Sequence, residues 1–416
     1  MSPDPGGPFL SRRGRGRRRY AVVVSVLLAA ALAGAGFMWR EPIGAAAVAA
    51  AEGISGAAKS VWGAWSRWGT SLQQRAAVMP VAPAPTPELE SDPAGSGAVL
   101  IAVGDGGSGA AFALAVRPPG GDPYLVMIPS TLLVHVPGFG EFSMAEALGF
   151  GGPELVRLAL ANEMGVRIDD LVAVPAGDLT VRGDTLVVAV PVELFVVGAD
   201  GSRRLIPPGR QELAMHLVEM LLLEQGEGDQ FDWLRRQEAV WRGMMTPGGA
   251  GDTPWSGLVP PGAPPETVAL MAEMDGQTLI VTPPVDRVAI GGGRDGLMLS
   301  RSRIEAFVAE RLGHLALREG RRPRVEILNG NGVAGSGVAV AAILISEGFH
   351  VVRSANADRF DYEQSRVFAQ GDAAVAAAVE AADILGVITV LLEVRAPSAV
   401  VDVSIIVGTD LANRED

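Results

Sequence analysis

Residues 127–158 read MIPSTLLVHVPGFGEFSMAEALGFGGPELVRL and decide the fold of the first large part of the chain. An apolar strand runs into Ile-Pro, a long loop follows, and Gly-Gly-Pro opens a helix. This order of strand, loop and helix is typical of the wall of a ligand site in a layered α/β domain. Ser130 and Thr131 follow the Ile-Pro directly, and neither side chain carries a charge. The stretch therefore predicts the backbone framework of a ligand site. It leaves open whether the side chains needed for binding or catalysis are present.

The composition limits the class of protein. A chain of 416 residues suggests two or three domains, and 48% hydrophobic residues against 19% charged ones are enough to build real cores. Cysteine is absent, which excludes disulfides, thiolate metal sites and a cysteine nucleophile. The four histidines, His135, His216, His314 and His350, are scattered along the sequence. We therefore predict no metal site.

Residues 20–39 form one long apolar segment without a charge. Twenty residues of helix, at about 1.5 Å each, cross a hydrocarbon core of about 30 Å. Tyr20 and Trp39 stand at the two ends, where amphipathic rings prefer the interface. A cleaved signal peptide is the alternative, but its apolar core is usually shorter, about 7–15 residues. We favour a retained transmembrane helix with residues 1–19 in the cytoplasm and the bulk of the chain extracytoplasmic.

The charge is unevenly distributed along the chain. Six of the 34 basic residues and one of the 47 acidic residues lie in residues 1–19. The remainder is therefore strongly acidic, and phosphate repels such a surface, so we expect no nucleic-acid partner. The arginines of the tail set the topology and face anionic headgroups. The cell membrane is the partner that this pattern predicts.

The pattern of turns and apolar runs divides the chain into five parts. The predicted parts are a basic tail (1–19), a transmembrane helix (20–39), a stalk with a Pro-rich linker (40–97), a first domain (98–320) and a C-terminal module (321–412). In the first domain, apolar strands alternate with helices predicted at 151–166, 210–225, 229–245 and 302–317, with Ser302 and Gly165 as caps. The module alternates strands with helices, the second of them at 372–385 and capped by Asp372. Both parts are predicted to be α/β folds.

A Gly-rich turn follows the first strand of the C-terminal module. Gly330, Gly332 and Gly335 fit the spacing of a dinucleotide fingerprint. The module is too small for a dinucleotide fold, however, and the strand that follows ends in no acidic residue. A tight turn with close packing explains the glycines better. Amides at the start of the next helix could still bind an anionic group such as a wall-polymer phosphate, so the three glycines are the candidate ligand-binding residues.

A serine hydrolase is not predicted. No Gly-x-Ser-x-Gly elbow follows a convincing strand in this sequence. Ser130 lies near His135 in the sequence, but such a pair arises more often by chance than by function.

Several motifs resemble those of a known family. VEILNGNGVAGSG (325–337), followed by GFHVV and DYEQSRV, resembles the LytR C-terminal domain across roughly 323–411. Across about 98–245, YLVMIPS stands where the family has a strand and Ile-Pro-Arg-Asp. The Gly-Gly-Pro helix, LIPPGRQEL (205–213) and DWLRRQEAVWRGMM (232–245) resemble further elements in the same order. With the arginine-rich start and single anchor, the chain resembles the LytR-CpsA-Psr (LCP) proteins of bacterial cell envelopes.

The resemblance implies a particular activity. Active members transfer an anionic glycopolymer from a polyprenyl pyrophosphate carrier onto peptidoglycan, with Mg²⁺. A pyrophosphate headgroup requires cations, and bidentate guanidiniums suit it. Carboxylates hold the Mg²⁺ that bridges the phosphates.

This sequence departs from the family at the positions that would carry that chemistry. The replacements are Ser130 for the arginine after Ile-Pro, Thr131 for its aspartate, Gly109 for a further aspartate, Leu221, Leu223 and Gln225 for Tyr-x-Arg-x-Arg, and Trp233 for an arginine of the last helix. Arg236 is retained, and Asp105 matches an early family aspartate loosely. Each lost guanidinium removes charge-assisted hydrogen bonds worth about 1.5–3 kcal/mol. The first domain is therefore predicted to be a degenerate LCP domain.

The sequence thus favours a non-catalytic, membrane-anchored binding or scaffold protein of the cell envelope, a pseudoenzyme without a cofactor. We expect it to engage peptidoglycan, a wall polymer or an envelope protein. The alternative is a divergent LCP ligase that uses Arg236, Asp105 and Mg²⁺. Direct promoter control has little physical support, because only a short arginine tail is predicted to lie inside the cell.

Overall fold

The computed structural model describes residues 97–106, 109–179, 185–197, 203–226, 228–246, 254–291, 294–386 and 393–412. The predicted tail, transmembrane helix, stalk and linker, up to residue 96, lie outside these residues. Among the helices that are described, none is both long and apolar enough to span a bilayer. The predicted transmembrane helix therefore stays a prediction, whereas the predicted α/β fold is confirmed.

The first domain is built on a mixed sheet of five strands. Its order is β11-β3-β2-β1-β6, with antiparallel pairing of β2 to β1 and β3 and parallel pairing at both edges. The strands are β1 (Gly97–Gly104), β2 (Ala110–Arg117), β3 (Tyr124–Ile128), β6 (Asp170–Val174) and β11 (Leu279–Val281). The distant β11 pairs with β3, so residues near 280 complete the sheet that begins at residue 97. The bounds of the predicted domain, 98–320, stay a prediction.

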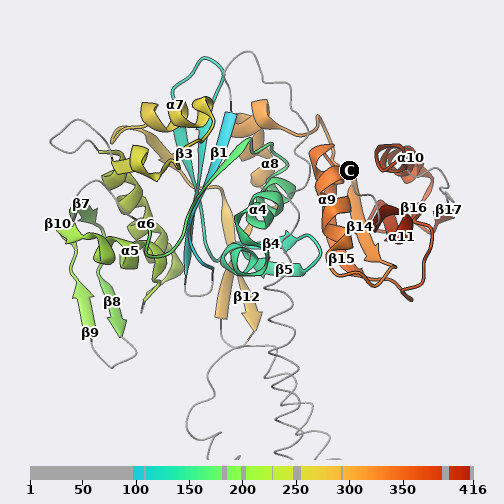
Figure 1. Ribbon diagram of the computed structural model, residues 1–416, viewed down its shortest axis with the longest axis horizontal. Coiled ribbons are helices and arrows are strands. Elements are labelled where there is room, and N and C mark those ends of the chain that lie inside the picture. The colour runs from blue at the N-terminus through green and yellow to red at the C-terminus, as the bar shows by residue number, and fades with distance from the viewer. Residues whose placement is uncertain are drawn as a thin grey trace, which may run out of the picture. The chain divides into compact units, whose positions relative to one another are not determined.

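Helices cover both faces of this sheet. On β1, Leu100 points to the face covered by α4 (Met144–Met164), whereas Ile101 points to the face covered by α5 (Met215–Leu223) and α6 (Gln230–Met245). Figure 1 shows α4 and α5 with α6 on opposite sides of the strands. The remaining elements of the first domain are β4 (Leu133–Val136), β5 (Gly140–Ser143), β7 (Thr185–Val190), β8 (Leu194–Val197), β9 (Arg203–Ile206), β10 (Gly209–Ala214), η1 (Pro254–Leu258), α7 (Pro265–Glu273), β12 (Val285–Gly291), β13 (Arg294–Leu299), α8 (Ile304–Phe307), η2 (Val308–Leu312) and η3 (Gly313–Leu315).

Helix α4 contains the Gly-Gly-Pro motif in its middle. The sequence predicts a helix from residue 151, but a helical segment already begins at Met144, where Ser143 and Glu146 form a capping box. Gly151 and Gly152 have non-helical dihedral angles, with φ of +71° at Gly152, so the motif is a kink between two helical segments. Gly165 ends the helix in the left-handed conformation, as predicted.

Two predicted helices are shorter than the sequence pattern indicates. In the segment 210–225, residues up to Ala214 pair with β7 as β10, and only Met215–Leu223 is helical. In the segment 302–317, short pieces of α, π and 3₁₀ helix replace one continuous helix, and Ser302 does not cap it. Tertiary pairing decided the first of these differences, because β10 satisfies its backbone groups on a strand that is distant in sequence.

The C-terminal module is a second mixed sheet with the order β15-β14-β18-β16-β17. Its elements are β14 (Arg324–Asn329), α9 (Ser336–Ser346), β15 (His350–Asn356), β16 (Arg366–Gln370), η4 (Asp372–Ala374), α10 (Val375–Ile384), β17 (Glu393–Arg395), β18 (Val403–Val407) and α11 (Thr409–Ala412). Asp372 lies in the 3₁₀ turn before α10 and does not cap it with its side chain. The predicted alternation of strands and helices is confirmed.

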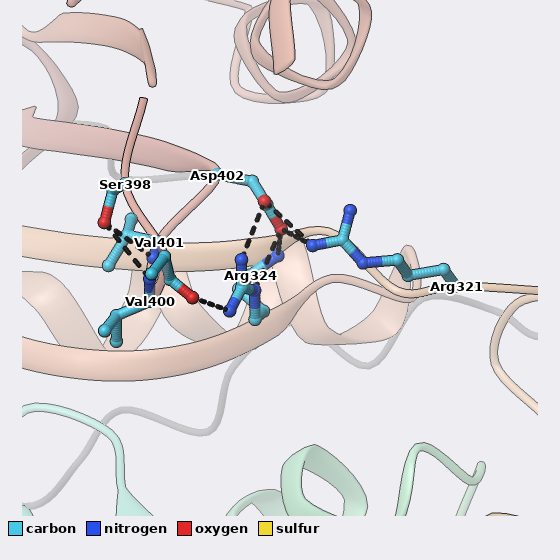
Figure 2. A network of polar contacts seen from close by, with 7 residues as sticks. Arg321, Arg324, Ser398, Val400, Val401 and Asp402 are labelled. Atoms are coloured by element: carbon cyan, nitrogen blue, oxygen red, sulfur yellow. Dashed lines mark hydrogen bonds and ion pairs between the residues drawn. The ribbon is translucent and has the colours of Figure 1, made fainter. Parts of the chain in front are cut away.

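Asp402 ties the start of the module to the loop before its central strand β18. Arg321 and Arg324 both donate to this carboxylate, and the backbone N–H of Arg324 donates to it at 2.8 Å. Arg324 also donates to Ala399 O at 2.6 Å. Figure 2 shows Arg321 and Arg324 both directed at Asp402. Burial alone would raise the pKa of Asp402, but the hydrogen bonds from Arg324 and Arg321 lower it below its usual range. The carboxylate therefore stabilises the module as an anion.

We expect Asp402→Ala to lower the free energy of unfolding of the module by about 2 kcal/mol, because three donors lose a charged acceptor. Since the pKa of Asp402 is depressed in the folded state, its contribution is present above the carboxyl's ordinary pKa of about 4 and is lost as the pH falls through the folded pKa. Thermal unfolding at pH 7 and at pH 3, with the exposed Glu347→Ala as control, measures this. If Asp402→Ala and Glu347→Ala lowered the free energy of unfolding equally at pH 7, the stabilising role of Asp402 would be contradicted.

Candidate functional site

The candidate site is the corner where β3 ends against α5 and α6. Ser130 is 3% exposed, and its hydroxyl donates to Ala110 O at the start of β2. The amide of Gln237, 1% exposed, donates to Leu222 O at 2.8 Å and approaches Ser130 Oγ at 3.3 Å. The indole N–H of Trp233 donates to the same Leu222 O at 3.1 Å. A closed set of neutral hydrogen bonds therefore fills the corner.

Thr131 extends this neutral set toward the start of α6. Its hydroxyl donates to Gln230 Oε1 at 2.6 Å, and Gln230 is 8% exposed. Thr131 is only partly buried, yet its partner is a side-chain amide and not a charged group. The two residues that follow Ile-Pro thus bond to the protein itself, which is the arrangement that favours packing over ligand binding.

Gly109 sits where the family resemblance places an aspartate. Its φ is +148°, and a Cβ added there would lie 2.1 Å from Leu223 O. Leu221 and Leu223, in the positions of the family's Tyr-x-Arg-x-Arg pattern, are 0% and 7% exposed and pack in the core between the sheet and α6. The chain at this corner is therefore too close-packed to admit the acidic and basic side chains that are missing from the sequence.

Arg236 is the one family arginine that is retained, and it is 1% exposed. Its guanidinium donates to Gln225 O at 2.7 Å and to Glu193 O at 3.2 Å, while its Nε has no hydrogen-bond partner. Burial lowers its pKa, and the nearby Asp232 opposes this. A pocket of about 380 Å³, lined by Glu193, Leu194, Phe195, Leu205, Gln225 and Arg236, lies beside it. Arg236 mainly joins the α5–α6 loop to the start of β8.

Asp105, the second catalytic candidate, lies at the end of β1. Its carboxylate accepts from the N–H of Ala176, just after the neighbouring strand β6, at 3.0 Å. Asp105 and Arg236 therefore bond to different elements, and no hydrogen bond or ion pair joins the two among the described residues.

The Mg²⁺ that the ligase alternative implies needs oxygen ligands that include carboxylates. The corner at the end of β3 offers hydroxyl and amide groups that already bond to one another, and the carboxylate of Asp105 caps a turn. Within the described ranges, no three His, Asp or Glu side chains gather as a metal site. The residues of this corner do not fit the ion.

The Gly-rich turn of the module uses most of its own amides. Asn329 Oδ1 accepts from the N–H groups of Asn331 and Gly332, and Gly330 N–H donates to Val407 O. A Cβ at Gly330 would lie 2.6 Å from Ile406 Cγ2, whereas at Gly335, with φ of +86°, it would meet open space. Gly330 is therefore required for packing, and Gly335 marks the open side of the turn at the start of α9. Binding at these glycines stays a prediction.

Sequence reasoning missed the contact of the first domain with the module. His135 does not meet Ser130; its Nε2 lies 3.0 Å from Ser354 Oγ in β15, 219 positions away in sequence. Asn162 at the end of α4 bonds to Val351 of the same strand. No local sequence pattern predicts such contacts. An asparagine on the apolar stripe of a helix does indicate that its side chain needs a buried hydrogen-bond partner.

The first domain and the module were compared with known proteins and solved structures. No curated protein sequence matches the chain. The crystal structure of B. subtilis TagV is 12% identical with a TM-score of 0.40, and the match covers 53% of this chain and 97% of that chain. For B. subtilis TagU the identity is 15%, the TM-score 0.37, and the coverage 55% and 99%. These TM-scores are below 0.5, so no conclusion about function follows from them.

A third solved structure is described as the LytR-CPS2A-psr family protein YwtF (TagT) with bound octaprenyl pyrophosphate lipid. It is 14% identical to this chain with a TM-score of 0.39, and the match covers 55% of this chain and 94% of that one.

The C-terminal module matches a family model. The family is described as LytR cell envelope-related transcriptional attenuator, and the match covers residues 322–411. The motifs that resemble this domain in the sequence, between roughly 323 and 411, lie inside the matched range. The prediction from these motifs is confirmed in that residues 322–411 match the model of this family.

Proposed function

We propose that this protein is a membrane-anchored, extracytoplasmic component of the cell envelope whose first domain is a non-catalytic relative of the LCP ligases. The domain would act as a rigid scaffold, and the C-terminal module would contact peptidoglycan or a wall polymer. Support for the envelope comes from the LytR C-terminal domain and from the arginine-rich tail before an apolar segment of membrane length.

The closed, neutral corner at the end of β3 is the observation that carries the non-catalytic reading. A pyrophosphate brings at least two negative charges, and a buried charge without a counterion costs several kcal/mol. Ser130, Gln237 and Trp233 offer only neutral groups there, and they are already bonded to the protein. A headgroup would have to break these bonds and would find no guanidinium in exchange.

The alternative, a divergent ligase, rests on Arg236. This guanidinium is a buried cation beside a pocket of about 380 Å³, and it forms no ion pair among the described residues. However, this guanidinium already donates hydrogen bonds to two backbone carbonyls, and its Nε is buried without a hydrogen-bond partner. One such cation offers much less than the cluster that the family resemblance implies for a pyrophosphate.

Incubation of the purified full-length protein with a lipid-linked glycopolymer, peptidoglycan and Mg²⁺ tests the proposal. We expect no polymer transfer above the protein-free background, with an active glycopolymer ligase as the positive control. Sedimentation with purified cell wall, measured in parallel, is expected to retain the protein. Turnover that falls in Arg236→Lys would establish the ligase alternative instead.

The open side of the Gly-rich turn provides a matched pair of variants for wall binding. Gly335→Asn keeps a residue type that tolerates a positive φ, whereas Gly335→Asp adds a negative charge of the same shape. If the turn binds a wall-polymer phosphate, Gly335→Asp weakens co-sedimentation with wall about tenfold and Gly335→Asn does not, since one unfavourable charge contact costs about 1.4 kcal/mol. Equal binding by both variants would place the contact elsewhere.

The family's missing aspartate cannot be restored at Gly109. We expect Gly109→Asp to lower the free energy of unfolding by more than about 3 kcal/mol, because the Cβ overlaps Leu223 O and φ is unfavourable. Gly257→Ala is the control, since nothing lies within 4 Å of its added Cβ. Thermal unfolding, followed by tryptophan fluorescence to which the buried Trp233, Trp241 and Trp255 contribute, measures the loss. A Gly109→Asp protein as stable as the wild type would show that the corner can open.

A further inference from the structure

The first domain covers an edge strand of the C-terminal module with a side chain. Strand β15 is at the edge of its sheet, where backbone groups are otherwise unpaired. Asn162 of α4 is fully buried; its Nδ2 donates to Val351 O at 2.8 Å, and its Oδ1 accepts from Val351 N–H at 2.9 Å. One amide side chain thus takes the place of a neighbouring strand at this residue.

Arg322, just before β14, belongs to the module and donates hydrogen bonds in the same contact. Its guanidinium donates to Asn162 O at 2.7 Å, to Phe349 O at 2.6 Å and to Gly348 O at 3.3 Å. The segment before it also pairs with the end of α4, because Leu317 N–H donates to Gly165 O at 3.0 Å. The module is therefore held in part through these backbone and amide groups, beside apolar side chains of both parts that belong to one hydrophobic cluster.

Two histidines belong to this contact, one from each part. His135 in β4 is 7% exposed and lies 3.0 Å from Ser354 Oγ, which also accepts from Gly138 N–H at 3.0 Å. His350 opens β15, and the electrostatic field of Arg322, His135 and Arg324 acts on it. The contact therefore gathers an arginine and two imidazoles in a poorly hydrated region, where added positive charge is unfavourable.

The protonation of these histidines opposes docking. Burial lowers the pKa of His135 to about 4. Burial, followed by the charges of Arg322, His135 and Arg324, lowers the pKa of His350 to about 4. In water an imidazole has a pKa of about 6.5, so the undocked form binds more protons between about pH 4 and 6.5. Docking is therefore fully favoured above this window and weakens as the pH falls through it.

Glu163 is the acidic group of the contact, and it titrates in the opposite sense. Burial raises its pKa, the backbone N–H of His135 and the charge of Arg322 lower it, Glu141 raises it and Arg301 lowers it. Docking then takes up a proton at Glu163, which favours docking in acid. One carboxyl group opposes two imidazoles. We therefore expect the histidines to decide the direction of the pH dependence, so that docking weakens in acid.

We propose that Asn162 and Arg322, together with His135, Glu163 and His350, form an acid-sensitive latch that holds the C-terminal module on the first domain at neutral pH and releases it in acid. Release uncovers the edge of β15 at Val351 while each sheet keeps its own strands.

Hydrogen exchange of the purified full-length protein tests the latch. Peptides that span β15 and the end of α4 report the opening, and peptides from β1 and β2 report global unfolding. Between pH 7.5 and 5.5, after correction for intrinsic exchange rates, we expect protection of the Val351 amide to fall at least about tenfold, since each histidine contributes up to about tenfold per pH unit. Protection of β1 and β2 is expected to stay unchanged.

Variants separate the latch from simple destabilisation. In the double variant His135→Asn with His350→Asn, protection of Val351, corrected for intrinsic exchange, should not fall between pH 7.5 and 5.5, because only Glu163 is left to titrate and it favours docking in acid. Glu163→Gln should make the acid response steeper. Asn162→Ala should raise exchange at Val351 already at pH 7.5. Constant protection of β15 in the wild-type protein between pH 7.5 and 5.5, or loss of protection in β1 and β2 together with β15, overturns the proposal.

Discussion

The central sheet of the first domain has to be covered on both faces, and the remaining layers follow from this constraint. Strands β1, β2 and β3 bury nearly every residue, whichever face the side chain points to. Leaving either face in water would expose apolar area that costs about 25 cal/mol per Å². Helix α4 therefore covers one face, and α5 and α6 with Trp241 and Trp255 fill the other. The candidate site lies at the edge of this packed core, where β3 ends against α5 and α6.

At that edge, the same strand–turn–helix arrangement that could hold a charged ligand holds a neutral network. Ser130, Gln237 and Trp233 share two backbone carbonyl acceptors, Ala110 O and Leu222 O. Gly109 brings the start of β2 against the end of α5 so closely that a side chain there would overlap Leu223 O. The backbone framework of a site can therefore be present without its reactive side chains. Packing depends on the course of the backbone, whereas catalysis depends on particular side chains.

The C-terminal module depends on two kinds of polar contact. Within the module, Asp402 receives hydrogen bonds from Arg321 and Arg324 and stabilises it as an anion. Between the module and the first domain, Asn162 and Arg322 satisfy backbone groups that docking removes from water. In the first contact, hydrogen bonds from Arg324 and Arg321 favour the charged form of Asp402, whereas the second contact places imidazoles where added charge is unfavourable. Their responses to acid therefore have different origins.

The sequence by itself determined the α/β class, the order of most strands, the end of α4 at Gly165 and the LytR C-terminal motifs, because apolar periodicity and glycine positions act locally. It also identified the neutral residues Ser130 and Thr131 in a corner where charges were expected. Only the tertiary structure decided that residues 209–214 pair as a strand, that Gly109 touches Leu223, and that Asn162 meets Val351. These are contacts between residues 19 to 189 positions apart, whose partners no local pattern specifies. Burial and hydrogen-bond satisfaction choose such partners, and both are properties of the folded chain.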